Sequence, residues 1–169
     1  MEVTIIGKDP LKLKESAKRK EHGNASFLAY LGNGLAQKEE LENFKEIVKE
    51  VEKRIDCREC ANCCINMCAR ITLGDVKRIA KKLEIPKSAF VKKYLVRDAR
   101  GRFSMKQMPC PFLDLKNKLC VIYETRPESC RSFPHLKEDL KKASEMILMN
   151  SKFCPIVYNV LENAKSAEI

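Results

Sequence analysis

The residues of this chain that could do chemistry are its cysteines, and five of the nine fall within twelve positions: Cys57, Cys60, Cys63, Cys64 and Cys68. Two thiolates at C-x2-C spacing can reach one soft cation from a single tight turn. The repeated spacing of Cys57, Cys60 and Cys63 also matches the opening of the C-x2-C-x2-C run that binds iron–sulfur clusters. Buried small side chains or disulfides are the alternative, but core packing gives no reason for so dense a cluster. The segment therefore predicts a metal site.

The other four cysteines, Cys110, Cys120, Cys130 and Cys154, are spread over the next ninety residues. Cys110 and Cys154 are each followed by proline, as is the closing cysteine of the bacterial iron–sulfur run. The only histidines are His22 and His135, and neither has a carboxylate pattern around it that would indicate a zinc hydrolase. There is no P-loop and no dinucleotide-binding glycine pattern. The sequence therefore indicates thiolate ligation and identifies no catalytic residue.

No segment of the sequence has the features of a membrane span or a secretion signal. The chain has no long apolar run, and its first seven residues lack the basic start of a signal peptide. We therefore expect a cytoplasmic protein with no membrane association, in a compartment where disulfides are rare. An odd number of cysteines also excludes complete internal pairing.

The net charge of +10 comes from one part of the chain. Residues 57–134 carry 17 Lys and Arg against 7 Asp and Glu, whereas residues 1–56 (11 against 11) and 135–169 (5 against 5) are neutral. Eight of the nine cysteines lie in the basic part. Positive side chains would offset the field of anionic thiolate centres, which is the explanation that this co-localisation favours. A nucleic-acid-binding face and a plain solvated surface are the alternatives.

The elements before the cysteine cluster form an N-terminal extension, residues 1–56. Apolar residues at intervals of three, four and seven predict an amphipathic helix over about residues 37–55. A short strand is expected at residues 3–6 and a short helix at 24–31, with a polar, lysine-rich stretch from 12 to 21. We expect the long helix to pack against the metal domain; binding of a partner or a second copy is the alternative.

Residues 57–169 are predicted to form the metal-binding domain. The spacing of Thr72 and Asp75 indicates the capped start of a helix, and a second helix begins near Pro86 or Ser88. Residues 110–123 indicate a hairpin, and Pro127 the first turn of a short helix that carries Cys130. Further helices are expected over residues 136–149, with His135 at the start, and from residue 156. The expected fold is mainly α with a small β-hairpin: a compact cysteine-rich domain of short helices and metal knuckles.

Taken together, these motifs resemble the YkgJ-type cysteine-cluster family, described as a zinc- or iron-chelating CxxCxxCC domain. The resemblance covers roughly residues 57–155 and is carried by C-x2-C-x2-C-C, Cys-Pro-Phe-Leu, Cys-x-Ile-Tyr-Glu-x-Arg-Pro, Cys-Arg-x-Phe-Pro and a late Cys. It implies polar positions near the site at Thr72, Asp75, Arg126 and Arg131. It also implies eight thiolate ligands: Cys57, Cys60, Cys63, Cys64, Cys110, Cys120, Cys130 and Cys154. Cys68 lies outside the pattern.

Eight thiolates would make two four-coordinate centres, either two zinc ions or two clusters; a single site with surplus thiols is the alternative. Because neighbouring side chains do not easily face one ion, we expect Cys63 and Cys64 to serve different centres, or one to be spare. Arg126 and Arg131 flank Cys130, and a guanidinium there could tune a bound cofactor, or could pair with Glu124 or Glu128 instead.

Three functions are compatible with these features. The first is an iron–sulfur protein, with a 4Fe–4S type of cluster, acting in electron transfer, an oxidoreductase-like reaction or protein modification with an unknown redox or protein partner. The second is a structural zinc-binding scaffold or interaction module. The third, which the sequence favours least, is a nucleic-acid-binding zinc protein.

Overall fold

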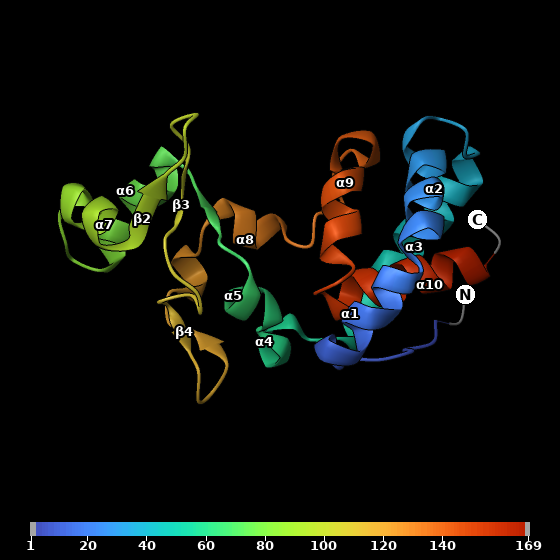
Figure 1. Cartoon of the computed structure of the whole chain (residues 1–169), viewed down its shortest axis with the longest axis horizontal. Coiled ribbons are helices and arrows are strands. Elements are labelled where there is room, and N and C mark those ends of the chain that lie inside the picture. The colour runs from blue at the N-terminus through green and yellow to red at the C-terminus, as the bar shows by residue number, and fades with distance from the viewer. Residues whose placement is uncertain (1–2, 168–169) are drawn as a thin grey trace. The chain divides into compact units, whose positions relative to one another are not determined.

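The computed structural model describes residues 3–167 and is mainly helical, with two small antiparallel sheets, which confirms the predicted fold class. Contacts divide the chain into two compact units. Unit 1 consists of the described residues within Met1–Cys57 and Pro134–Ile169, and unit 2 is Arg58–Phe133. In Figure 1, unit 1 comprises the blue and blue-green helices before residue 57 with the orange-red helices after residue 134, and unit 2 comprises the green, yellow and ochre elements between them in the sequence. The division at residue 56 into an extension and a metal-binding domain stays a prediction.

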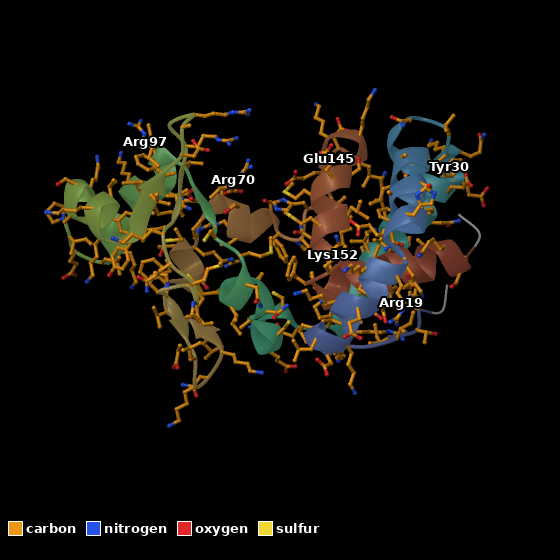
Figure 2. The ribbon with its side chains drawn as sticks, viewed as in Figure 1. Arg19, Tyr30, Arg70, Arg97, Glu145 and Lys152 are labelled. Carbon is orange, nitrogen blue, oxygen red and sulfur yellow. The ribbon has the colours of Figure 1, made fainter. Side chains whose placement is uncertain are left out.

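Unit 1 is a group of helices: α1 (Pro10–Arg19), α2 (Glu21–Gly32), α3 (Lys38–Arg54), α9 (Leu140–Asn150) and α10 (Pro155–Ser166). The amphipathic helix is confirmed as α3, which buries Phe44, Ile47, Val48 and Val51. Helix α2 packs against α9, and α3 against α10 (Figure 1). The first of these pairs comes so close that a Cβ on Gly32 would lie 3.0 Å from the Cα of Lys141. Lys152, which follows α9, reaches Glu21 of α2 at 2.7 Å (Figure 2).

Three parts of unit 1 differ from the sequence prediction. The lysine-rich stretch is helical, as α1, because Asp9 caps its start and Leu13 and Ala17 are buried against Tyr158 of α10. Residues 3–6 are extended, but they pair with no strand in the described part of the chain. Helix α9 begins at Leu140, four residues later than expected, because the Asp139 side chain caps it there.

Residue His135 is consequently outside any helix. Its φ of 69° is left-handed, and its Nδ1 lies 2.7 Å from Glu138 Oε1. It is therefore not the helix-start residue that we expected.

Unit 2 is built from short elements around the cysteines. After α4 (Cys57–Cys60), whose first residue belongs to unit 1, come α5 (Asn62–Asn66), α6 (Leu73–Lys82), α7 (Lys87–Tyr94), the one-turn helix η1 (Tyr123–Thr125) and α8 (Glu128–Ser132). The strands are β1 (Arg70–Ile71), β2 (Leu95–Arg97), β3 (Phe103–Met105), β4 (Leu113–Asp114) and β5 (Leu119–Cys120). One antiparallel sheet has the order β1-β3-β2, and β4 pairs with β5 in the predicted hairpin.

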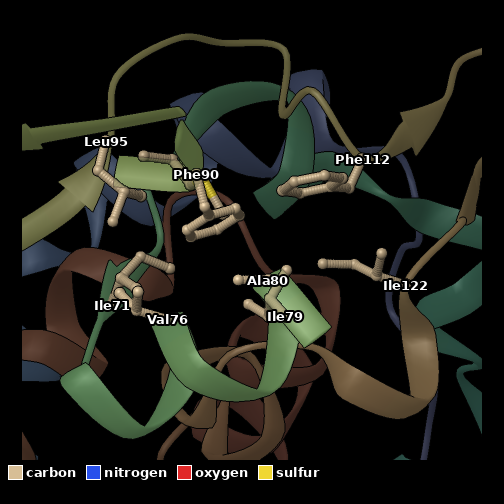
Figure 3. Packing of buried hydrophobic residues seen from close by; sticks show 9 residues of the cluster. Ile71, Val76, Ile79, Ala80, Phe90, Leu95, Phe112 and Ile122 are labelled. Carbon is tan, nitrogen blue, oxygen red and sulfur yellow. The ribbon is translucent and has the colours of Figure 1, made fainter. Parts of the chain in front are cut away.

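The core of unit 2 lies between α6, α7 and the hairpin (Figure 3). The rings of Phe90 and Phe112 stack with centroids 6.4 Å apart, and Ile79 is fully buried beside them. Cys110 and Cys120 pack against this core. Both cysteines are thus anchored by the apolar packing of unit 2.

Unit 2 also carries the whole excess of positive charge, with 17 Lys and Arg against 7 Asp and Glu. Much of this charge is exposed, including Lys81 and Lys82 of α6 and Lys92 and Lys93 of α7. Arg97 lies over the Phe103 ring, 5.1 Å from its centroid (Figure 2). Among the helices of residues 3–167, none is long and apolar enough to cross a membrane.

Candidate metal centre

The cysteine cluster folds as two short helical pieces rather than a loop. Helices α4 and α5 are separated by Ala61, whose φ of 50° is left-handed and allows the chain to turn between them. Cys63 and Cys64 lie on α5, with their Sγ atoms 4.0 Å apart. Two thiolates on one tetrahedral ion, with metal–sulfur bonds of about 2.3 Å, lie roughly 3.8 Å apart. The two sulfurs are thus close enough to share an ion, and their assignment to different centres stays a prediction.

Main-chain contacts bring two further cysteines to Cys64. The N–H of Cys110 donates to the carbonyl of Cys64 at 2.7 Å. The carbonyl of Cys110 in turn accepts from the N–H of Leu113 at 3.0 Å, and Leu113 is paired directly with Cys120 across the β4–β5 hairpin. These main-chain bonds therefore link the segments that carry Cys64, Cys110 and Cys120.

Helix α8 adds Cys130 to this group. The Ser129 hydroxyl donates to the carbonyl of Arg70 at 2.8 Å, and the N–H of Glu128 donates to Asp75 Oδ1 at 3.2 Å. These bonds attach α8 to β1 and to the start of α6. The prediction that Cys130 lies on a short helix after Pro127 is confirmed, and the two hydrogen bonds fix the position of that helix.

The four thiols influence one another's ionisation. Burial raises the pKa of Cys110 to about 11 and of Cys130 to about 12, and it also raises the pKa of Cys120. The charge of Cys64 raises the pKa of all three; Cys110 and Cys120 each raise that of Cys130, and Cys120 that of Cys110. Every pair among Cys64, Cys110, Cys120 and Cys130 thus interacts. We call this set the thiol tetrad.

The pKa of Cys64 is shifted in the opposite direction, to about 7, because the neighbouring Cys63 thiol hydrogen-bonds to its sulfur and outweighs the effect of burial. Cys64 is therefore the member of the tetrad most easily ionised. A divalent cation would favour the charged thiolate forms of the other members and would offset the repulsion between them, because thiols that coordinate a metal are deprotonated. Across residues 3–167, no three Cys, His, Asp or Glu side chains already stand in an arrangement that could hold a metal ion. Ligation of a metal by the tetrad stays a prediction.

Asp75, in the first turn of α6, joins that helix to α8 through hydrogen bonds. The predicted capping box is confirmed: Thr72 Oγ1 accepts from the N–H of Asp75 at 3.0 Å, and Asp75 Oδ2 accepts from the N–H of Thr72 at 2.8 Å. Asp75 Oδ1 also accepts from Arg78 at 2.6 Å and from the N–H of Glu128. Burial alone would raise the pKa of Asp75, but these hydrogen bonds outweigh it and lower the pKa. Arg78 was missed by sequence reasoning, although its i+3 spacing from Asp75 was a usable signal.

The two arginines beside Cys130 occupy different positions. Arg126 stacks on Tyr123 with its Cζ 3.8 Å from the ring centroid, and its charge lowers the pKa of Cys120 in opposition to the larger effect of burial. Arg131 donates to the main-chain carbonyls of Arg126, at 3.2 Å, and Glu124, at 2.6 Å. Arg126 thus acts on a thiol, whereas Arg131 holds the chain that carries Arg126.

The remaining cysteines are distributed between the units. Cys60 and Cys63 are half-buried in unit 2, while Cys57, which is exposed, and Cys154, which is buried at the start of α10, belong to unit 1. Cys68 is exposed, but its charge contributes to the raised pKa of Cys110. It therefore lies nearer to the tetrad than its place outside the motif indicated. The ligand roles of Cys57, Cys60, Cys63 and Cys154, like those of the tetrad, stay predictions.

Comparison with known families gives this site a class. A family model described as "CxxCxxCC: Putative zinc- or iron-chelating domain" matches residues 56–155. The chain belongs to this family. The matched region of the CxxCxxCC domain contains all nine cysteines and the whole of unit 2. No solved structure matches that of this chain.

Proposed function

We propose that the thiol tetrad of unit 2 is the binding site of an iron–sulfur cluster and that the protein acts in one-electron transfer. The observation that carries the proposal is the set of main-chain bonds that link the segments of Cys64, Cys110 and Cys120. The electrostatic interaction of these three thiols with one another and with Cys130 of α8 supports it. Four thiolates are the usual ligand set of a cluster. Such a cluster supplies a site that accepts and returns one electron; the donor and acceptor would be redox partners of a class that the chain does not identify.

The residues around the tetrad support this function by their charge. A thiolate-bound centre is anionic, and its reduced form carries one more negative charge. The excess of positive side chains lies in the same unit, and Arg126 acts directly on Cys120. A cation near a ligand sulfur stabilises the reduced state most and therefore raises the reduction potential.

A structural zinc site is the second candidate, and the small size of the elements in unit 2 favours it. Strands of two or three residues and helices of four or five surround the thiols. Elements this short gain little stability alone, and in small domains bound zinc commonly supplies the difference. In that case unit 2 would be a scaffold or interaction module.

Metal analysis of protein purified without oxygen separates the two candidates. The iron–sulfur proposal predicts iron and acid-labile sulfide in stoichiometric amounts, with visible absorption that bleaches on reduction by dithionite. Zinc without iron or sulfide in protein from iron-replete cells would reject it.

A variant then tests the role assigned to charge. Arg126→Gln is expected to lower the reduction potential of the bound cluster, whereas Arg97→Gln, on the β2–β3 hairpin, is the matched control and should leave it unchanged. Equal potentials for the wild type and the Arg126 variant would contradict the electrostatic role of Arg126.

A further inference from the structure

The outer side of the α6–α7 pair carries lysines without acidic neighbours. The two helices pack against each other, and their inner sides bury Ile79 and Phe90 in the core of unit 2 (Figure 3). Residues 76–94 contain six lysines and one acidic residue, Glu84. All six lysines are exposed, and none of them makes an ion pair with any residue of the described part of the chain. We call this set the lysine surface: Lys77, Lys81, Lys82, Lys87, Lys92 and Lys93.

Helix α3 shows how the same chain builds an ordinary charged surface. Its Lys45, Lys49 and Lys53 each bind the glutamate three residues earlier, at 2.6–2.8 Å. Interleaved charges of both signs keep an exposed helix soluble and stabilise it slightly. The lysine surface has the positive charges without the glutamates, so solvation alone does not explain its composition.

The dipoles of the two helices explain only part of the lysine surface. The last turns of α6 and α7 each hold two lysines, where a positive charge is favourable. Lys87, however, is the first residue of α7, where the helix dipole disfavours a positive charge. Lys106 adds another positive charge nearby, because its Nζ donates to the Lys92 carbonyl at 3.1 Å. Helix stability therefore gives no reason for the near absence of acidic residues here.

The lysine surface lacks the groups that bind nucleic acids best. Arg78, the one arginine of residues 76–94, is bound to Asp75 and to the Arg126 carbonyl, so its planar fork is already engaged. Of the two rings in α7, Phe90 is buried and Tyr94 is half-buried against it, which leaves no open platform for a base on this helix. Exposed, mobile ammonium groups instead suit the carboxylates of a protein in a transient, salt-sensitive complex.

We propose that the lysine surface is the docking site of an acidic protein, whose exposed carboxylates pair with these ammonium groups. A surface of one sign attracts a partner of the opposite sign and speeds its association. Cys110 and Cys120 pack against the core that α6 and α7 cover, and one layer of helix, about 10 Å thick, separates that core from the outer side. Under the proposed function, on which this last step rests, the acidic protein is the partner that exchanges electrons with the cluster.

The test measures binding of an acidic peptide after charge has been removed from two different surfaces. The probe is a fluorescently labelled helical peptide with glutamates along one face, and anisotropy at low salt gives its dissociation constant. Glutamine replaces four lysines in each of two variants of the full chain. The test variant changes Lys81, Lys82, Lys92 and Lys93, and the matched control changes the lysines of α3: Lys38, Lys45, Lys49 and Lys53.

Both variants have the same net charge, so only the position of the lost charges differs. The test variant should bind the peptide at least about tenfold more weakly than the wild type, and the control should change the affinity less than about twofold. Circular dichroism checks that each variant is folded. Replacement of Lys81 and Lys82 alone is a milder change, and it should cause a smaller loss of affinity if the fourfold variant does not fold.

Three results would overturn the proposal. Absence of peptide binding by the wild type at low salt would remove the docking site, and an equal loss of affinity in the two fourfold variants would assign the binding to net charge alone. Tighter binding of single-stranded DNA, or of vesicles that contain phosphatidylserine, lost in the test variant, would assign the surface to phosphate groups. The peptide carries no redox group, so zinc in place of iron would reject the proposed function without changing these binding results.

Discussion

Replacement of Asp75 by asparagine is the sharpest test of how unit 2 is held together. Asp75 is 1% exposed, and its two oxygens accept from Thr72, Arg78 and Glu128. An amide has one oxygen, so at least one buried donor must face the new NH2 group. Leaving a buried donor unsatisfied costs about 1–3 kcal/mol, and loss of the charge opposite the partly exposed Arg78 adds a smaller amount. We therefore expect Asp75→Asn to lower the free energy of unfolding by about 2–4 kcal/mol, a large share of a typical total.

The assay is denaturant unfolding of the metal-loaded chain at pH 7, followed by circular dichroism. Asp98→Asn is the matched control, because Asp98 also accepts several hydrogen bonds in unit 2 but is exposed, and its replacement should lower the free energy of unfolding much less. The pKa of Asp75 is lowered in the folded state. The stabilisation of the fold by ionised Asp75 is therefore fully present above its pKa in the unfolded state, about 3.9. It is lost as the pH falls through the lower pKa of Asp75 in the folded state. An Asp75→Asn variant within about 0.5 kcal/mol of the Asp98 control at pH 7 would refute the reasoning.

Three further predictions follow from charges elsewhere. At pH 7 the thiols of Cys110 and Cys130 are neutral, so loading the tetrad with zinc should release about three to four protons, and zinc affinity should rise with pH. Calorimetry in buffers of different ionisation enthalpy measures the proton release, and release of fewer than about two protons would contradict this prediction. The wild type should bind DNA or RNA only weakly, with an affinity that falls steeply as salt is added, and metal content should be unchanged after charge reversal at Lys81, Lys82, Lys92 and Lys93. Sub-micromolar binding near physiological salt that is lost on this charge reversal would support the nucleic-acid alternative. Glu162→Gln should lower the free energy of unfolding by about 1–3 kcal/mol, because the buried Glu162 carboxylate binds both Lys20 and Lys165. Glu42→Gln, in an exposed ion pair, is the control and should change it little, and equal melting temperatures of the two variants would reject the prediction.

Local signals in the sequence predicted the elements that depend on near neighbours. The spacing of apolar residues identified α3, the Thr72–Asp75 pair identified the start of α6, and the pattern of residues 110–123 identified the β4–β5 hairpin. In each case the stabilising contact lies within a few residues. The mainly helical fold class followed from these patterns.

The features that sequence reasoning missed depend on contacts between distant segments. Helix α1 has the composition of a polar stretch because only Leu13 and Ala17 on one face are buried. Tyr158, which covers that face, lies far away in the sequence. The segment at residues 3–6 has a strand-like composition, but its partners are the asparagines of α10. Arg78 and Cys68 were passed over because their importance depends on where Arg126 and Cys110 lie in space.

For the site, the sequence identified the ligand chemistry but could not say which thiols lie together. Spacing in the cluster favours grouping Cys57, Cys60 and Cys63, since they are closest along the chain. The structure instead brings Cys64 to Cys110, Cys120 and Cys130, through a main-chain bond, a hairpin and the attachment of α8. None of these long-range contacts could be read from the spacing of cysteines alone.

The most direct test of the central claim is bound metal in three anaerobically purified proteins: the wild type, Cys130→Ala and Cys68→Ala. Cys130 belongs to the tetrad, while Cys68 is a nearby exposed thiol outside it, so the same substitution serves as test and control. We predict iron and acid-labile sulfide in the wild type and in Cys68→Ala, and loss of most of both in Cys130→Ala. Full metal occupancy in Cys130→Ala, or its loss in Cys68→Ala, would contradict the tetrad as the metal centre.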